Sequence, residues 1–124
     1  MAQSTYADNH LLAVAGEGFA CGFYEGAGYA LVGTRVRTRS GEIDLILAAP
    51  DGETVFVEVK TRHGLDFGAA EAVTPKKLAT MRRCAAEWLE GRDYGPVRFD
   101  VAEVLFTDDE VRIQIYEDVD HGAC

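Results

Sequence analysis

The stretch EIDLILAAPDGETVFVEVK, residues 42–60, decides the fold because it predicts two β-strands joined by a tight turn. Apolar side chains recur through residues 42–49 and again through 54–62, as in strands that pack on a core. Between them, PDGE (50–53) has a proline and a glycine where a turn needs them. We therefore predict a β-hairpin over this stretch.

Three charged residues, Asp44, Glu58 and Lys60, lie inside these strands, where a soluble protein has least reason to place charges. Successive side chains point to opposite faces of a strand, so Glu58 and Lys60 share the face opposite Val57. If the apolar faces of the two strands coincide, the register places Asp44 beside Glu58. A slip by one residue would turn the charges toward the core, which supports this pairing. We therefore predict that two carboxylates and an amine meet on one face of the sheet.

This grouping predicts a metal-dependent nuclease. Two adjacent carboxylates repel each other, so at least one resists ionisation unless a cation neutralises the pair. Mg²⁺ or Mn²⁺ suits such a pair, because these ions prefer oxygen ligands and keep positions open for water and phosphate oxygens. The ion would polarise a phosphodiester and lower the pKa of a bound water. Lys60 would orient that water or stabilise negative charge in the transition state.

The alternative is that these residues form ordinary solvated ion pairs on an exposed sheet face, which are common. Apolar residues flank the charges of the strand over 54–62, as in an interior strand. The charged face of the sheet also needs a cover, and we expect the helix predicted over 7–27 to provide it. Charged side chains buried under a helix are costly unless another charge compensates them, and this favours the metal site.

Two helices are predicted outside the hairpin. Leu12, Phe19 and Phe23 recur at spacings of seven and four, which predicts a helix over 7–27 with this stripe as its apolar face. The second helix begins after Thr74, a good N-cap followed by proline, and ends near residue 90. Its buried face is expected to consist of Leu78, Met81, Ala85 and Trp88 or Leu89.

The remaining apolar stretches predict three further strands, over residues 29–38, 97–106 and 110–117. The predicted order is αβββαββ, an α/β domain with a central mixed β-sheet flanked by helices. A chain of 124 residues suits a single domain, 1–124. We expect its core over about residues 11–117, followed by a polar tail over 118–124.

The charge of the chain is unevenly distributed. The net charge is −9, which alone argues against a nucleic-acid partner. Residues 35–83, however, hold nine of the twelve basic residues and seven of the 21 acidic ones, a net charge of +2. The sequence has no apolar run near the roughly 20 residues of a membrane span and no secretory signal at its start, so we expect a cytoplasmic protein. Cys21, Cys84 and Cys124 predict free thiols, since their spacing fits neither zinc nor a disulfide framework.

The motif GEIDLI (41–46) followed by VFVEVKTR (55–62) resembles the D…ExK core of the PD-(D/E)XK nuclease superfamily. With the stretch over 16–40, VTPKK (73–77) and RFDVAEV (98–104), the chain resembles the YraN-like family, uncharacterised proteins similar to archaeal Holliday junction resolvases. The resemblance covers roughly residues 11–106. It implies a restriction-endonuclease-like fold, with a central mixed sheet flanked by helices.

The resemblance also implies roles for individual residues. By position, Asp44 and Glu58 match the metal-binding acids and Lys60 the catalytic lysine. Glu17 matches the glutamate that resolvase-like members add from a helix, and the Val59 backbone carbonyl is a further candidate metal ligand. For Glu17 the alternative is an ordinary solvated helix residue.

Basic residues around this core predict a DNA-binding surface. Arg35, Arg37 and Arg39 alternate, so we expect them to share one strand face or its rim. Arg62 directly follows the charged strand and could reach a flanking phosphate. A final pair, Lys76 and Lys77, lies in the first turn of a helix, where lysine opposes the helix dipole but assists phosphate binding. Their alternative role is merely to keep the surface soluble.

The sequence therefore predicts a Mg²⁺- or Mn²⁺-dependent endonuclease acting on DNA, and no base-reading motif is visible in the sequence. Recognition would depend on the shape of the DNA, such as a branch or flap, and would be sensitive to salt. Two other functions stay open: a nucleic-acid-binding module with weak or no cleavage, and a scaffold whose acidic surface binds a basic partner. Because junction resolvases act as pairs, the resemblance also leaves a homodimer open.

Overall fold

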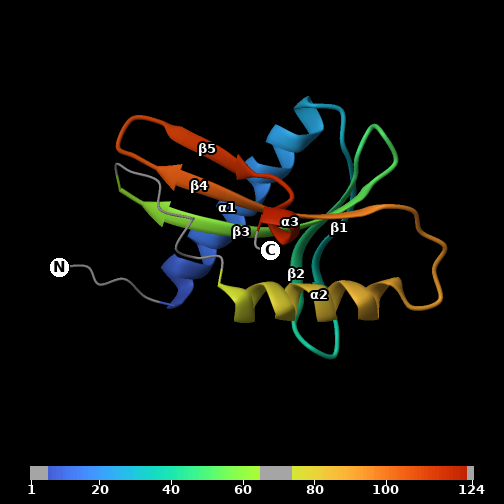
Figure 1. The fold of residues 1–124 in the computed structure, drawn as a ribbon. Helices are drawn as coiled ribbons and strands as arrows, with labels where there is room; N and C mark the ends of the chain where they lie inside the picture. The colour runs from blue at the N-terminus through green and yellow to red at the C-terminus, as the bar shows by residue number, and fades with distance from the viewer. Residues whose placement is uncertain (1–5, 65–73, 123–124) are drawn as a thin grey trace.

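The structure is a computed structural model that describes residues 6–64 and 74–122. Its elements follow the predicted order αβββαββ, with one short helix added at the end (Figure 1). In chain order they are α1 (Tyr6–Gly26), β1 (Ala30–Arg37), β2 (Glu42–Ala48), β3 (Thr54–His63), α2 (Pro75–Leu89), β4 (Val97–Phe106), β5 (Val111–Tyr116) and α3 (Val119–Gly122).

The five strands form one mixed sheet in the order β1-β2-β3-β4-β5. The pairs β1–β2, β2–β3 and β4–β5 are antiparallel, whereas β3 and β4 are parallel. A parallel pair needs a crossover, and α2 lies within the segment that makes it. A mixed sheet with helices on its faces confirms the predicted fold class and is consistent with a restriction-endonuclease-like fold.

The register of β2 against β3 is the predicted one. Leu45 pairs with Val57 and Leu47 with Val55, and all four side chains are buried. Continuing this register by one position places Asp44 opposite Glu58. The matched apolar faces fix the register, because a shift by one residue would exchange the buried valines for charged side chains.

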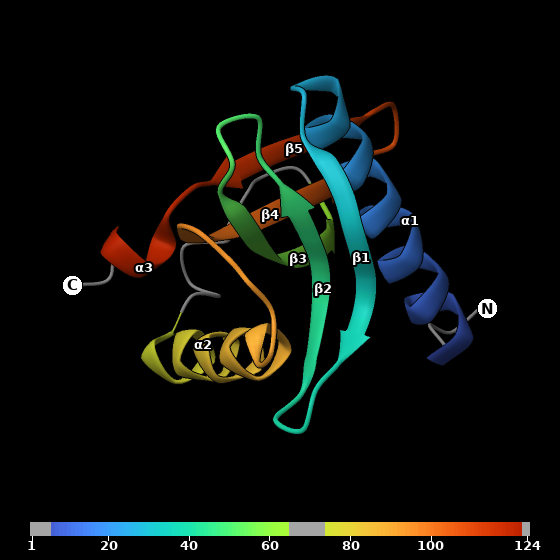
Figure 2. The ribbon, with the colours of Figure 1, turned by 90° about the vertical axis from the view of Figure 1, so that its right-hand side faces the viewer.

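The sheet has a hydrophobic core on each face. On one face, Ala20 and Tyr24 of α1 pack against β2, β3 and β4. On the other face, Cys84 and Ala85 of α2 pack around Phe56 of β3. Figure 2 shows the two helices on opposite sides of β1 and β2.

The predicted cover of the charged face is wrong. The side chains of α1 pack on the apolar face that contains Leu45 and Val57, and α2 instead lies over the face that carries Glu58. The sequence did not show which helix covers which face of the sheet, because each helix is joined to strands of that sheet and could reach either face.

The predicted apolar stripe of α1 is also wrong. Phe19 and Phe23 are 46% and 51% exposed, whereas Ala20 and Tyr24 are buried. The reason is Gly16, which lets the helix lie close to β3: a Cβ at this position would come within 3.1 Å of the Thr61 Cβ. The helix therefore buries its small residues and one tyrosine and leaves two phenylalanines near the surface.

This close approach predicts opposite effects for two similar substitutions in α1. We expect Gly16→Ala to lower the free energy of unfolding by about 1–3 kcal/mol, because the added methyl displaces Thr61 or the helix. Gly18→Ala should raise it by about 0.5–1 kcal/mol, because a Cβ there meets no atom within 4 Å and alanine favours the helix. Urea denaturation measures both. Effects of the same sign would contradict the packing of α1 on β3.

The helix α2 begins as predicted. The Thr74 side chain accepts a hydrogen bond of 3.1 Å from the Lys77 backbone N–H, and Pro75 is the first helical residue. The buried side chains of the helix are Leu78, Cys84, Ala85 and Leu89, while the expected Met81 and Trp88 are only half-buried. The Cys84 thiol is free and buried, as predicted, and Cys124 lies outside the described residues.

Of the predicted polar tail, 118–124, the structure describes residues 118–122, and Asp118 and Val119 contact the rest of the domain. Asp118 adopts a positive φ of 57°, and its backbone N–H donates to the buried carboxylate of Asp100. The same carboxylate accepts two hydrogen bonds from Arg98 and one of 2.8 Å from the Tyr24 hydroxyl. Each buried polar group in this network is paired, as buried charge requires.

Among the described residues, neither long helix has the length and apolar character of a membrane-spanning segment.

Candidate active site

Asp44 is held against the backbone of the neighbouring strand. The β2–β3 ladder ends at the pair of Leu45 and Val57, so the next residues of the two strands no longer pair through their backbones. Asp44 Oδ2 takes the place of a backbone acceptor and receives a hydrogen bond of 2.7 Å from the Val59 N–H. This bond fixes the carboxylate at the end of the ladder, beside Glu58.

Burial raises the pKa of Asp44 to about 7, because the charged form loses its contact with water. The hydrogen bond from Val59 opposes this shift, and the negative charges of Glu58, Glu17 and Glu42 add to it. Near neutral pH, Asp44 therefore either keeps a proton or needs a positive charge beside it.

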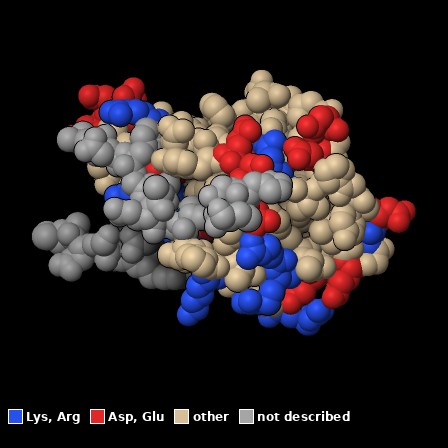
Figure 3. Space-filling model, in the orientation of Figure 1, with Lys and Arg blue, Asp and Glu red and all other residues tan. Residues whose placement is uncertain are grey.

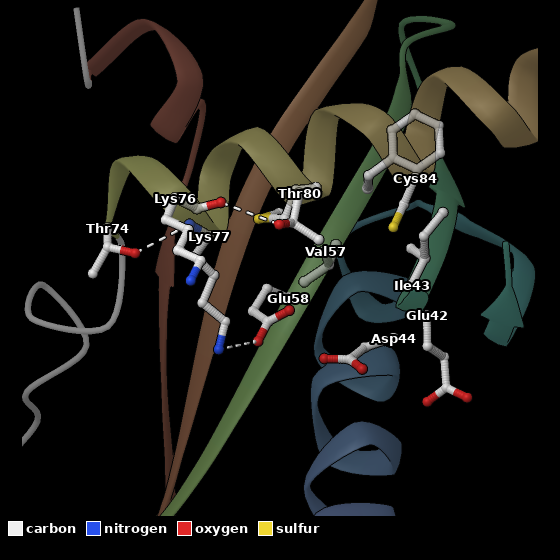
Figure 4. A pocket seen from close by; sticks show the side chains of 12 residues that line it. Glu42, Ile43, Asp44, Val57, Glu58, Thr74, Lys76, Lys77, Thr80 and Cys84 are labelled. Atoms are coloured by element: carbon white, nitrogen blue, oxygen red, sulfur yellow. Dashed lines mark hydrogen bonds and ion pairs between the residues drawn. The ribbon is translucent and has the colours of Figure 1, made fainter. Parts of the chain in front are cut away.

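Two lysines supply positive charge on the other side of the pair. The Glu58 Oε2 atom lies 3.2 Å from Lys77 Nζ and 4.0 Å from Lys60 Nζ. The adjacent Lys77 amine, and then burial, lower the pKa of Lys60. In Figure 4 the carboxylates of Asp44 and Glu58 turn toward the same space, Lys77 reaches Glu58 from α2, and Glu42 turns away.

Glu17 is not a solvated helix residue. Its side chain is only 15% exposed, and Arg35 Nε donates a hydrogen bond of 2.8 Å to its Oε1 atom. Arg35 adopts a positive φ of 48°, a strained conformation for a residue other than glycine. The β1–β2 register places Arg35 opposite Asp44. Glu17 therefore borders the site and raises the pKa of Asp44, but its direct partner is Arg35.

A cavity of about 390 Å³ opens beside the carboxylate pair, between α2 and the strands β2 and β3 (Figure 4). The residues that line it from the sheet are Glu42, Ile43, Asp44, Phe56, Val57 and Glu58. Those that line it from α2 and its cap are Thr74, Lys76, Lys77, Thr80, Met81 and Cys84. Acidic and basic side chains thus share the walls with an apolar surface.

The donor set fits a Mg²⁺ or Mn²⁺ ion that keeps part of its water. Within residues 6–64 and 74–122, no three His, Cys, Asp or Glu side chains are grouped closely enough to hold a metal by themselves. Mg²⁺ commonly takes only one or two carboxylates and completes its shell with water and substrate oxygens. Asp44 and Glu58 offer such a pair, and the pKa of Asp44, raised first by burial and then by the neighbouring carboxylates, shows a cost of ionisation that a bound cation would offset.

The basic residues predicted to bind DNA do not form one group. Arg37 is exposed on β1, whereas Arg39, in the turn after it, is paired with Glu90 at 3.1 Å near the end of α2. Arg62 is paired with the buried carboxylate of Glu103 at 3.3 Å. The three arginines do not continue one alternating strand face, because Arg35 has a positive φ and β1 ends at residue 37. Their binding of DNA stays a prediction.

Lys76 and Lys77 do lie at the cavity. Figure 3 shows lysine and arginine side chains gathered over α2 on this face of the molecule, with acidic side chains among them. The sequence predicted that Lys77 contacts phosphate, but it did not predict the ion pair of Lys77 with Glu58. The residues next to Lys77 and Glu58 in the chain do not indicate which end of α2 lies beside β3.

Comparison with known proteins identifies relatives over most of the chain. The model of the uncharacterised protein family UPF0102 matches residues 16–104. A UPF0102 protein of Corynebacterium diphtheriae is 44% identical over 121 residues, which cover 97% of this chain and 99% of the relative. A UPF0102 protein of Corynebacterium efficiens is 48% identical, over 90% of this chain and 93% of the relative. Another, of Rhodococcus jostii, is 46% identical, over 80% of this chain and 86% of the relative.

Proposed function

The chain belongs to the uncharacterised protein family UPF0102, the YraN-like family that its motifs predict, and we propose that it is a metal-dependent endonuclease that hydrolyses phosphodiester bonds in DNA. One observation carries the proposal. Asp44, held by the Val59 N–H at the end of the β2–β3 ladder, lies with Glu58 at a cavity that Lys76 and Lys77 also line. Lys60 lies 4.0 Å from Glu58.

In this proposal Asp44 and Glu58 hold Mg²⁺ or Mn²⁺, with the Val59 carbonyl as a further candidate ligand. When bound, the ion polarises the phosphodiester and lowers the pKa of a water molecule. The hydrogen bond from Val59 keeps the Asp44 carboxylate in place as the ion arrives. Glu17, tied to Arg35, adds negative charge at the border of the site without leaving its own ion pair.

The lysines have separate tasks. Lys60 lies at the edge of the acid pair, 4.0 Å from Glu58, where its amine would hold the attacking water in line with phosphorus or stabilise negative charge in the transition state. Lys76 and Lys77, at the N-terminus of α2, attract the phosphate that approaches the cavity, since helix N-terminus and lysines both favour an anion. Lys77, paired here with Glu58, would make this contact when Glu58 serves as a metal ligand.

The ion pairs of Glu58 favour a second function. Both Lys60 and Lys77 already neutralise this carboxylate, so a cation must compete with two amines for it. If the lysines win, the protein binds DNA at this site with weak or no cleavage.

A panel of labelled DNAs separates the two functions. It contains duplex, flapped, branched and single-stranded forms, each incubated with protein and Mg²⁺ or Mn²⁺. We expect cleavage of forms that have unpaired or branched strands, cleavage that stops with EDTA, and weaker binding as salt rises. Binding without cleavage of any form would support the binding module, and the absence of both would contradict a nucleic-acid function.

A further inference from the structure

We infer that the cavity beside the acid pair receives an unstacked nucleobase, so that the substrate is DNA with an unpaired nucleotide next to the phosphate that is cut. This inference rests on the proposed function and specifies its substrate. It starts from the mixed character of the cavity, whose inner walls are apolar while its rim is charged.

The inner walls suit the flat faces of a base. Ile43 and Phe56 contribute from the sheet, and Met81 and Cys84 from α2. Figure 4 shows Cys84 and Ile43 close together where α2 meets β2, with Thr80 nearer the start of α2. Phe56 is 1% exposed and stacks on Phe99, so it closes the cavity from below, whereas Met81 is only half-buried and offers a thioether, which packs favourably against a π-system. Part of these walls belongs to the hydrophobic core of this face, and the apolar surface that stays open to the cavity contributes nothing to binding a phosphate or a hydrated metal ion.

The rim suits the rest of the nucleotide. Lys76 and Lys77 stand on one side with the N-cap Thr74, and Asp44 and Glu58 on the other. A nucleotide whose base enters between α2 and the sheet therefore leaves its phosphate between the lysines and the acid pair. A partner with only apolar groups, such as a lipid chain, would leave these charges without a counterpart.

The size of the cavity is also suitable. At about 390 Å³ it lies in the range of pockets that enclose small organic ligands. A base inside an intact duplex cannot reach such a space, and extruding it costs least where the base is already unpaired. The cavity thus favours flaps, bulges and branch points over duplex DNA.

The walls do not select among the four bases. The Thr80 hydroxyl already donates to the Lys76 carbonyl and accepts from Arg83. The Cys84 thiol is a weak hydrogen-bonding group. Stacking accepts any base, since every base has a π-face. Recognition would therefore follow the structure of the DNA rather than its sequence.

The test uses 2-aminopurine, a fluorescent base, as the single unpaired nucleotide of a bulged duplex, with the full chain and EDTA so that no strand is cut. Binding is followed by anisotropy of a distant dye and insertion by 2-aminopurine emission. We expect emission to change several-fold on binding. An abasic residue at the same position should weaken binding about tenfold, because each stacked base contributes that order of affinity.

Two variants of α2 locate the insertion. Thr80→Phe fills the cavity and should abolish both the emission change and the preference for the bulge. Ala86→Phe adds the same ring on the exposed side of α2, away from the cavity, and should preserve both. The comparison of abasic and intact DNA needs no variant, so it holds even if Thr80→Phe does not fold.

Each combination of the binding, emission and cleavage results leads to one conclusion. Equal binding of abasic and intact DNA with unchanged emission would overturn the base pocket, and cleavage by the same protein with Mn²⁺ would leave the proposed endonuclease intact. Emission that changes on binding while no DNA is cut would support the pocket and contradict the endonuclease. Absence of binding to any DNA would overturn both.

Discussion

Replacing Lys60 by alanine is expected to slow DNA cleavage by about 10²- to 10⁴-fold, the usual contribution of a positioned acid–base or water-orienting group. The reason is the position of the amine, 4.0 Å from the Glu58 carboxylate and with a lowered pKa. Single-turnover rates at saturating DNA measure the effect, because they separate cleavage from binding.

The matched control is Arg112→Ala, which removes one positive charge from β5, where Arg112 is paired with Glu110 on the surface. Its cleavage rate should equal that of the wild type. If the Lys60 variant also cleaves at the wild-type rate, or if only its affinity for DNA falls, Lys60 has no part in the chemical step.

Replacing Asp44 by asparagine is expected to stabilise the metal-free protein, by an amount that grows between pH 4 and pH 7 and stays constant above pH 7. In an unfolded chain the pKa of aspartate is about 4, whereas in the folded protein that of Asp44 is about 7. Below pH 4 the group is protonated in both states, and the variant gains nothing. Between pH 4 and pH 7 the unfolded chain loses this proton while the folded wild type keeps it, so the wild type loses stability across this range, and the loss is complete above pH 7.

At pH 8 the variant should therefore exceed the wild type in free energy of unfolding by on the order of 2–4 kcal/mol, and the difference should fade toward pH 4. Asparagine keeps an oxygen that can accept the Val59 N–H. Urea denaturation with EDTA at several pH values measures the difference. Asp109→Asn, on an exposed turn, should show no such trend. The quantity to compare is the free energy of unfolding of Asp44→Asn minus that of the wild type. If this difference were smaller at pH 8 than at pH 5, Asp44 would not be a buried and repelled carboxylate.

Local signals predicted much of the fold. The turn at 50–53, the proline after Thr74 and the alternation in the hairpin each act over a few residues, and each gave an element with nearly the observed bounds. The register that brings Asp44 beside Glu58 followed from matching apolar faces, since only one alignment buries them together. The acid pair was therefore within reach of sequence reasoning.

Features that depend on distant contacts were not predictable. In the sequence Gly16 is only a residue that disfavours a helix, yet in the structure it sets the distance between α1 and β3. Arg35 reads as one of an alternating set, yet its positive φ turns it to Glu17. The Lys77–Glu58 ion pair depends on where the crossover places the start of α2. In each case the decisive neighbour is more than ten residues away, and a single sequence carries no signal for it.

Titration calorimetry of Mn²⁺ into the wild type, Asp44→Asn and Asp109→Asn tests most directly whether the acid pair is a cation site. We predict that Mn²⁺ binds to the wild type and to Asp109→Asn but not to Asp44→Asn. Mn²⁺ should accordingly raise the melting temperature of the first two proteins and leave that of Asp44→Asn unchanged. Equal Mn²⁺ binding by all three proteins, or by none, would contradict the proposal that Asp44 and Glu58 hold the metal.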